Sequence, residues 1–342
     1  MVVQRYTMKN PLYIWGEQIP GNAKHLKTDI LNIHEEYTPH DLFDKYPGIW
    51  DKSSDELGDL SGNDTMVYRQ EIEHGPAEIT YTDRPFLLPY LSEGSDQAVV
   101  ICPGGAYLTK SMVTEGEQIA ELLNEAGISA FILWYRSYPY REPIMFLDAQ
   151  RAIRYVRYHA ADFGIDPKKI GLLGFSAGGN LAGVTSLLLR NQDWFQELDY
   201  HLDKIDREDA SISALGLIYP AISLQKDKII AVLAGADSYR DPVTCQAVAD
   251  RLDMRNGLRN GDAPLFICAA LDDEVVPAQH CLDLVHKANE KGISTEIHLF
   301  AKGGHGFGAC LGEQMPQFYH DWTLVQQWKD LYLTWLKTVW KE

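Results

Sequence analysis

The chain has few cysteines and no long apolar run. Only five of its 342 residues are cysteine, and Cys102 and Cys268 lie in apolar strand patterns where a reduced thiol is the default. No stretch reaches the roughly 18 apolar residues that a membrane-spanning helix needs. Residues 1–5 also lack the apolar centre of a signal peptide. We therefore expect a cytoplasmic protein that does not bind membranes.

Basic residues are scarce relative to acidic ones. The chain has 31 Lys and Arg residues against 48 Asp and Glu residues, and its formal net charge is -17. Such a charge repels nucleic-acid phosphates and anionic membrane surfaces, so neither is an expected partner. The His and acidic residues over 34–41 match no zinc spacing, and a solvated segment is the better interpretation there. We expect no metal site.

One stretch carries a clear chemical pattern. Residues 169–175 predict an apolar strand, and residues 179–189 predict a helix. The turn between them contains Gly174, Ser176 and Gly178 in a Gly-x-Ser-x-Gly arrangement, which is typical of a nucleophile elbow. In such a turn the serine backbone is strained and its hydroxyl projects above the sheet. A chance match in an ordinary turn is the alternative, and the flanking strand and helix disfavour it.

A nucleophilic serine needs a base and an orienting acid. In hydrolases with this elbow, the chain order is serine, then acid, then histidine. His305 follows the strand predicted over 295–300 and lies among four glycines, which makes it the best candidate base. Asp272 and Asp273 follow another predicted strand, over 263–271. Because adjacent side chains point in different directions, only one can face the histidine; we favour Asp273, with Asp272 capping the turn.

Acyl transfer also needs amide donors for the oxyanion. Ala177, next to the serine, supplies one N–H group. The second normally comes from an earlier loop, and the strand predicted over 98–102 leads into a small-residue loop that contains Gly105 and Ala106. These three residues are the predicted oxyanion hole. An ordinary Pro-Gly turn is the alternative for the loop.

The remaining pattern predicts an α/β fold. Strands alternate with helices from residue 98 onward, which indicates a mostly parallel central sheet with helices on both faces. Short alternating runs within 67–91 predict an antiparallel hairpin before it. Residues 1–65 form an N-terminal extension that could cover the active site, and residues 66–342 form the catalytic domain. Residues 191–211 interrupt the alternation as either a lid or a solvated insertion.

Several aromatic residues are candidate pocket walls. Tyr107, Tyr138, Tyr140 and Phe307 lie on loops at the predicted catalytic edge of the sheet, where ligands of open parallel sheets bind. In the N-terminal extension, aromatic residues either wall the pocket or anchor the segment to the core, and we favour the anchor for them. These are Tyr13, Trp15, Tyr37 and Trp50.

These motifs resemble those of the acetylxylan-esterase-like carboxylesterases of the α/β-hydrolase superfamily, over about residues 65–340. The resemblance rests on the loop after residue 102, the Asp-Ala-Gln-Arg-Ala run at 148–152, the Gly-Phe-Ser-Ala-Gly-Gly elbow, the Asp-Asp-x-Val-Val-Pro loop and the Gly-Gly-His-Gly-Phe loop. It implies an α/β-hydrolase fold, with Ser176 as nucleophile, Asp273 as acid and His305 as base. It also implies hydrolysis of short acyl esters, often acetyl groups on sugars, without a cofactor.

The predicted function is therefore a serine carboxylesterase acting on a small-molecule ester, foremost an acetylated sugar. Pro103 starts the loop where hormone-sensitive-lipase relatives have His-Gly-Gly-Gly, which argues against a lipase of that branch. A serine peptidase and a non-catalytic binding protein on a hydrolase fold are the alternatives. The sequence leaves the oligomeric state open, and a homo-oligomer is compatible with it.

Overall fold

The computed structural model of the chain describes residues 11–22, 67–71, 78–192, 195, 198–225, 228–311 and 320–341. Most of the predicted N-terminal extension, including Tyr37, Trp50 and the acidic and histidine residues over 34–41, lies outside the described residues. The prediction that this extension covers the active site concerns these same residues and therefore stays a prediction.

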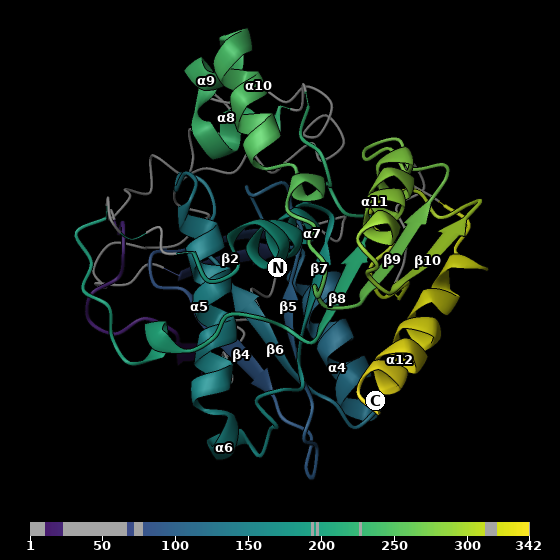
Figure 1. The fold of residues 1–342 in the computed structure, drawn as a ribbon, viewed down its shortest axis with the longest axis horizontal. Helices are drawn as coiled ribbons and strands as arrows, with labels where there is room; N and C mark the ends of the chain where they lie inside the picture. Colours follow the sequence, from purple (N-terminus) through teal and green to yellow (C-terminus); the bar gives the residue numbers. More distant parts are fainter. Residues whose placement is uncertain are drawn as a thin grey trace.

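An eight-stranded sheet forms the centre of the molecule (Figure 1), in the order β1-β4-β6-β5-β7-β8-β9-β10. Strands β5 to β10 are parallel to one another, whereas β4 pairs antiparallel with β6 and β1 pairs antiparallel with β4. The strands are β1 (Leu12–Tyr13), β4 (Phe86–Tyr90), β5 (Ala98–Cys102), β6 (Ser129–Trp134), β7 (Ile170–Phe175), β8 (Ala214–Ile218), β9 (Leu265–Ala270) and β10 (Thr295–Phe300).

The inner strands are apolar because both faces of the sheet are covered. Every residue of β5, β6, β7, β8 and β9 is buried, which is the expected pattern for a parallel sheet between two helical layers. A separate pair, β2 (Val67–Glu71) and β3 (Glu78–Thr82), is the antiparallel hairpin predicted before the sheet.

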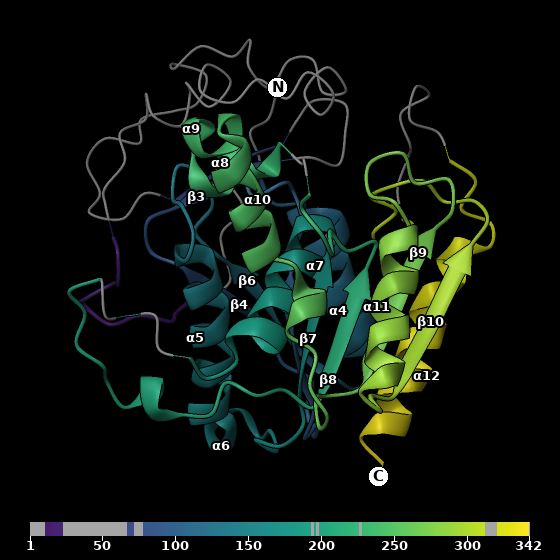
Figure 2. The ribbon, with the colours of Figure 1, turned by 45° about the horizontal axis from the view of Figure 1, so that its top comes forward.

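Two helical layers and two hydrophobic cores flank the sheet (Figure 2). One core includes α5 (Ile144–Tyr158), α7 (Ser176–Gly183), the π-helical segment η2 (Val184–Leu189) and α11 (Gln279–Glu290). The other includes the π-helical segment η1 (Met112–Glu117), α4 (Gln118–Glu125) and α12 (Trp328–Val339). The predicted mostly parallel sheet with helices on both faces is thus confirmed. Among the described helices, none combines the length and the apolar character that crossing a bilayer requires.

Three short helices between β8 and β9 were not predicted, because the sequence indicated only a loop region containing Gly235. They are α8 (Ile229–Ala234), α9 (Ala236–Arg240) and α10 (Pro242–Arg251), and they project from the molecule at the top of Figure 1. Gly235, at φ +99°, separates the first two. Asp241 caps the third by accepting the Thr244 amide at 2.9 Å, and Pro242 is its first residue. This Asp-Pro start is a signal that could have been found.

The described N-terminal segment, residues 11–22, is part of the core. Strand β1 extends the sheet, and the side chain of Trp15 is buried. Its indole nitrogen donates to Asp148 Oδ1 at 2.8 Å, and the guanidinium of Arg151 lies 4.7 Å from its ring centre. Trp15 therefore anchors the segment, as expected for the aromatic residues there.

The Asp-Ala-Gln-Arg-Ala run on α5 explains that anchorage. Asp148 and Arg136 form a fully buried ion pair, with Nη2 and Oδ1 2.7 Å apart. Arg136 also donates through Nη1 to the carbonyl of Pro20 at 2.8 Å, and Arg151 donates through Nε to the carbonyl of Ile14 at 2.7 Å. The polar residues of this helix thus hold the N-terminal segment against the sheet.

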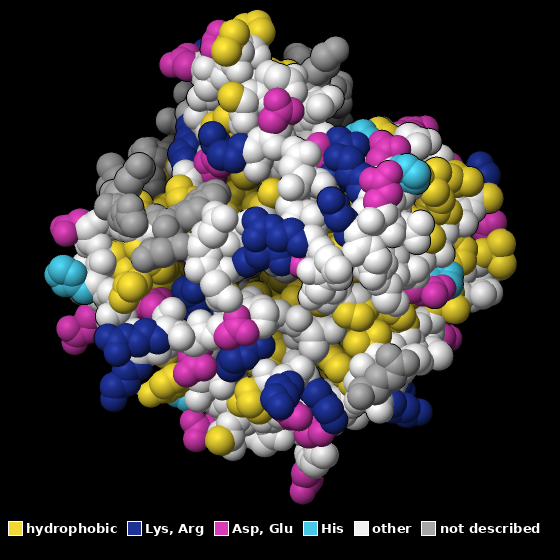
Figure 3. Space-filling model, viewed as in Figure 1, with side chains coloured by type: hydrophobic (Ala, Val, Ile, Leu, Met, Phe, Trp, Pro, Cys, Tyr) yellow, Lys and Arg dark blue, Asp and Glu magenta, His cyan; other side chains and the backbone are white. Residues whose placement is uncertain are grey.

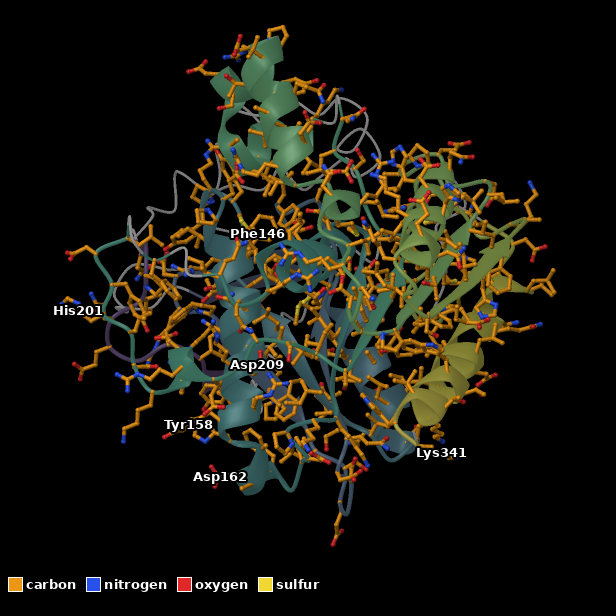
Figure 4. All side chains as sticks on the ribbon, viewed as in Figure 1. Phe146, Tyr158, Asp162, His201, Asp209 and Lys341 are labelled. Atoms are coloured by element: carbon orange, nitrogen blue, oxygen red, sulfur yellow. The ribbon has the colours of Figure 1, made fainter. Side chains whose placement is uncertain are left out.

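The described part of 191–211 is also fastened to α5. Arg151 pairs with Asp206 at 2.7 Å and with Asp203 at 2.6 Å. Arg157, near the C-terminal end of α5, donates to the carbonyl of Asp209, which is labelled in Figure 4. The segment links the end of η2 to the start of β8, so both of its ends lie at the sheet edge opposite Ser176. Whether the segment is a lid or a solvated insertion stays a prediction.

Charges of both signs are mixed on the face seen in Figure 3, where Lys and Arg side chains lie among Asp and Glu side chains.

One lysine side chain, that of Lys110, is enclosed in the protein. The ammonium of Lys110 lies 3.0 Å from Ser137 Oγ, 3.4 Å from the carbonyl oxygen of Thr80 and 4.7 Å from the ring centre of Tyr135. Lys110 is fully buried, and this desolvation lowers its pKa to about 7.

The buried lysine predicts a pH-dependent stability. Unfolded Lys110 keeps its proton to about pH 10, whereas the folded protein loses it near pH 7, so its contribution to stability falls as the pH falls toward 7. We compare the unfolding free energy of Lys110→Met with that of wild type at two pH values. We expect the difference, variant minus wild type, to be about 2 kcal/mol larger at pH 7 than at pH 9. Urea denaturation at both pH values measures this. Exposed Lys287 provides the control Lys287→Met, and an equal difference at both pH values would contradict the expectation.

Candidate active site

Ser176 lies on a strained turn between β7 and α7. Its φ is +51°, a left-handed conformation that residues with side chains rarely adopt. The turn needs small neighbours, because a Cβ on Gly174 would lie 2.2 Å from the carbonyl oxygen of Gly178, and one on Gly178 would lie 2.0 Å from that of Cys102. The α-helix begins at Ser176 rather than at the predicted residue 179, so the serine is at the helix N-terminus.

The structure brings Ser176, His305 and Asp273 together. Ser176 Oγ lies 2.8 Å from His305 Nε2, and His305 Nδ1 lies 2.8 Å from Asp273 Oδ2. The side chain of Asp273 is fully buried, and that of His305 is 18% exposed. Three groups distant in sequence thus form one hydrogen-bonded chain.

The two adjacent aspartates have different partners. Asp273 Oδ1 accepts the amides of Val275 at 2.9 Å and Val276 at 2.8 Å, which fixes the carboxylate while Oδ2 faces the imidazole. Asp272 Oδ1 instead accepts the amide of Gly304 at 2.9 Å. Asp272 therefore holds the histidine loop from the side, and only Asp273 contacts the imidazole.

Glycines allow the histidine loop to turn around His305. Gly304 has φ +64° and Gly306 has φ +73°, both in the region that favours glycine. A Cβ on Gly304 would lie 2.4 Å from the ring of His320. The loop therefore has no room for a larger residue immediately before the histidine.

The predicted oxyanion loop lies directly against the nucleophile turn. A Cβ on Gly104 would lie 2.9 Å from Ser176 Cβ. Gly105 and Ala106 have φ values of +126° and +55°, and the carbonyl of Gly105 accepts the amide of Thr109 at 2.9 Å. Within the described residues, the amides of Gly105, Ala106 and Ala177 donate to no protein acceptor. Their role as oxyanion donors stays a prediction.

Two site residues were missed by the sequence analysis. Tyr219 directly follows β8, and its ring lies 5.0 Å from that of His305. Glu115 lies in η1, and its Oε2 accepts the amide of Gly104 at 2.6 Å. Burial raises the pKa of Glu115, whereas the Gly104 amide, the Tyr219 hydroxyl and nearby His305 lower it. The end of a strand at the catalytic edge was a signal for Tyr219, but Glu115 had none.

Two of the predicted pocket tyrosines are bonded through their hydroxyls to neighbours. Tyr107 Oη donates to Asn180 Oδ1 at 2.8 Å, and Tyr140 Oη donates to Asp83 Oδ1 at 2.6 Å. Both side chains are at most 3% exposed. Each thus has a structural role behind the catalytic edge, and contact with a substrate stays a prediction for them.

The other two predicted pocket residues are also buried. The ring of Tyr138 faces the guanidinium of Arg141 at 5.3 Å, and that guanidinium donates to the carbonyl of Ala231 on α8. Phe307 packs edge-on against Tyr219, with ring centres 4.4 Å apart. Phe307 therefore supports the histidine loop, and a contact of either residue with a substrate stays a prediction.

In the described part of the chain, no three His, Cys, Asp or Glu side chains come together as a metal site requires.

A family comparison bears on this geometry. The BD-FAE family model matches residues 86–288, more than half of the chain. The chain belongs to the BD-FAE family. The matched span of this BD-FAE member contains the oxyanion loop, Ser176 and Asp273, whereas His305 lies beyond it.

Curated relatives support the same family. The chain is 31% identical over 220 residues to an acetylxylan esterase of Xylanibacter ruminicola, which covers 63% of this chain and 42% of that relative. It is 27% identical over 298 residues to endo-1,4-beta-xylanase B of Butyrivibrio fibrisolvens, which covers 83% of this chain and 44% of that relative. The chain thus spans less than half the length of these two relatives.

A solved structure gives the fold. The acetyl ester-xyloside bifunctional hydrolase of Caldicellulosiruptor lactoaceticus superposes with a TM-score of 0.64 at 32% identity, covering 75% of this chain and 88% of that one. Together with the family match, this confirms the predicted resemblance to acetylxylan-esterase-like α/β-hydrolases and the predicted α/β-hydrolase fold.

Proposed function

We propose that this BD-FAE member is a serine carboxylesterase that hydrolyses short-chain acyl esters, foremost acetyl esters of sugars. The observation that carries the proposal is the hydrogen-bonded chain from Ser176 through His305 to Asp273, beside three free amides. A strained serine, a base within hydrogen-bond reach and an acid that orients the base are the parts that nucleophilic ester hydrolysis needs.

In the first half-reaction, His305 Nε2 takes the proton of Ser176 as Oγ attacks the ester carbonyl carbon. The carbonyl oxygen becomes an oxyanion and is bound by the amides of Gly105, Ala106 and Ala177. The ester C–O bond then breaks, and His305 gives its proton to the leaving alcohol. The product is an acyl-enzyme on Ser176, while Asp273 stabilises the transient imidazolium.

In the second half-reaction, His305 takes a proton from water, whose oxygen attacks the acyl carbon. The tetrahedral intermediate uses the same amides. It collapses by breaking the bond to Ser176 Oγ, which recovers its proton from His305. The carboxylic acid leaves, and the free enzyme is restored without a cofactor.

The proposed substrate class comes from the relatives. One is named an acetylxylan esterase, one a xylanase and one an acetyl ester-xyloside hydrolase. All three names refer to xylan or a xyloside, and two of them refer to acetyl esters, so an acetylated xylose or xylo-oligosaccharide is the proposed substrate.

Domain limits and compartment belong to the proposal too. We assign residues 66–342 to the catalytic domain and residues 1–65 to an extension whose described part, residues 11–22, packs on the core. All five cysteines are free thiols, Cys102, Cys245, Cys268, Cys281 and Cys310. Unpaired cysteines suit a reducing compartment, and this supports the cytoplasm.

A hydrolysis panel tests the proposal. We expect kcat/KM for 4-nitrophenyl acetate to exceed that for the decanoate by about tenfold or more, because pocket contacts discriminate acyl chains. Acetylated xylobiose is expected to release acetate. A peptide 4-nitroanilide tests the peptidase alternative, and we expect no turnover of it. Preference for the decanoate, or faster amide than ester cleavage, would overturn the proposal.

A further inference from the structure

The Glu115 carboxylate uses both of its oxygens inside the protein. Oε2 accepts the amide of Gly104 at 2.6 Å, and Oε1 accepts the hydroxyl of Tyr219 at 2.9 Å. The side chain is 3% exposed. One end of this carboxylate therefore fixes the residue that precedes the two proposed oxyanion donors of the loop.

Tyr219 continues the connection to the histidine loop. Its hydroxyl oxygen accepts the amide of Gly308 at 2.9 Å, and its ring lies 5.0 Å from the imidazole of His305. Tyr219 has φ +36° and is fully buried, so its ring has little freedom to move. A single buried chain of hydrogen bonds thus joins Gly104, Glu115, Tyr219 and Gly308.

A purely structural role is the competing explanation. A buried carboxyl group must be hydrogen-bonded wherever it lies, and a well-packed apolar pair is often as stable as a buried polar one. Two features go beyond that role. Both ends of the chain are amides of loops that carry proposed catalytic groups, and Glu115 bonds the hydroxyl of the tyrosine whose ring packs on the imidazole of His305.

We infer that Glu115 and Tyr219 are positioning residues of the active site. They set the oxyanion loop and the histidine loop at a fixed distance, and the Glu115 carboxylate adds a second negative charge that favours the imidazolium on His305. The inference rests on the proposed function, because it assigns roles around the proposed triad.

The charge effect has a defined direction. Within the described residues, the imidazole contacts Asp273 at Nδ1, Ser176 at Nε2 and the ring of Tyr219, and Glu115 bonds the hydroxyl of that tyrosine. Removing the Glu115 charge disfavours the imidazolium. The acidic limb of the kcat/KM profile, which reports protonation of the base, then moves toward lower pH. A change that only loosened the fold would not move this limb.

The test compares Glu115→Gln, Tyr219→Phe and wild type with 4-nitrophenyl acetate between pH 5 and pH 9. We expect kcat to fall about 10- to 100-fold in Glu115→Gln, with KM within about threefold, because oxyanion donors act in the transition state. Its acidic limb should move down by about half a pH unit or more. Tyr219→Phe removes a single oxygen and should lower kcat by a smaller factor.

Controls separate the possible outcomes. Glu121→Gln removes an exposed carboxylate from α4 and should match wild type. Thermal melting reports folding; if Glu115→Gln does not fold, Tyr219→Phe carries the test. Wild-type kcat in both variants, or a loss of kcat in Glu115→Gln with an unmoved acidic limb, would overturn the inference.

A second readout does not depend on the choice of ester. A fluorophosphonate reacts with an activated serine as the serine oxygen bonds to phosphorus and fluoride leaves. We expect both variants to be labelled at least about fivefold more slowly than wild type, since the reaction needs the same base and amides. If the wild type is labelled but hydrolyses no acetyl ester, and both variants are labelled more slowly than it, the proposed substrate fails and the inference stands. Equal labelling rates would sink the inference.

Discussion

Replacing Ser176 by alanine is expected to lower kcat/KM for an acetyl ester by about 10⁴-fold or more. The substitution removes the only atom that bonds to the acyl group, while the amides of Gly105, Ala106 and Ala177 remain. Residual catalysis by such donors is small compared with the loss of the nucleophile. Steady-state kinetics with 4-nitrophenyl acetate measure the effect.

The matched control for this variant is Ser186→Ala. Ser186 lies on η2 in the same chain segment, and its hydroxyl donates to the carbonyl of Ala182 at 2.7 Å. Its loss should leave kcat/KM within about twofold, because surface and helix-side substitutions away from a site have small effects. Activity of Ser176→Ala within tenfold of wild type would show that another group performs the attack.

Asp273→Asn is expected to lower kcat by about 10³- to 10⁴-fold. The Asp273 carboxylate accepts the His305 Nδ1 proton and so leaves Nε2 free to take the proton of Ser176. An amide at this position can present its NH₂ group to Nδ1 and favour the wrong imidazole tautomer. It also removes the negative charge that stabilises the imidazolium. KM should change little, because the interaction strengthens mainly in the transition state.

Asp272→Asn provides the comparison from the adjacent residue. An asparagine there can still accept the Gly304 amide through its oxygen, so we expect kcat to stay within about tenfold of wild type. Both variants lose one carboxylate from the same loop, and the comparison therefore isolates the position of the charge. Equal losses in the two variants, or a larger loss in Asp272→Asn, would assign the acid to the other residue.

The sequence predicted the strands of the sheet because their apolar character is local. The runs at 98–102 and 295–300 coincide with β5 and β10, and the predicted strand at 169–175 differs from β7 by one residue. The elbow was predictable for the same reason. Gly174 is needed by a contact within the turn, with the carbonyl of Gly178, whereas Gly178 and Gly179 are needed by contacts with Cys102 and Pro220 on distant parts of the chain.

Features that depend on tertiary contacts were harder to predict. Strand β1 is two residues long and exists because it pairs with β4. Helices α8 to α10 are short and are interrupted by Gly235, so their hydrophobic periodicity is weak. The partners of Glu115 come from distant elements, and no local pattern marks a glutamate in a helix as part of a site.

The choice between adjacent aspartates shows where sequence reasoning ends. The pattern indicated that only one of Asp272 and Asp273 faces the base, and the direction of each side chain is set by the loop. The amides of Val275 and Val276 orient Asp273, whereas Gly304 on the histidine loop takes Asp272. The pocket residues show the same limit, since a loop position at the catalytic edge did not reveal that Tyr107 and Tyr140 are bonded to internal partners.

The most direct test of the central claim is mass spectrometry of the protein after reaction with a fluorophosphonate. The account predicts one adduct per chain, mapped by proteolysis to the peptide that contains Ser176, and no adduct in Ser176→Ala. It also predicts much slower labelling in His305→Ala, where the base is missing. An unlabelled wild type, or an adduct on any other residue, would contradict the assignment of Ser176 as an activated nucleophile.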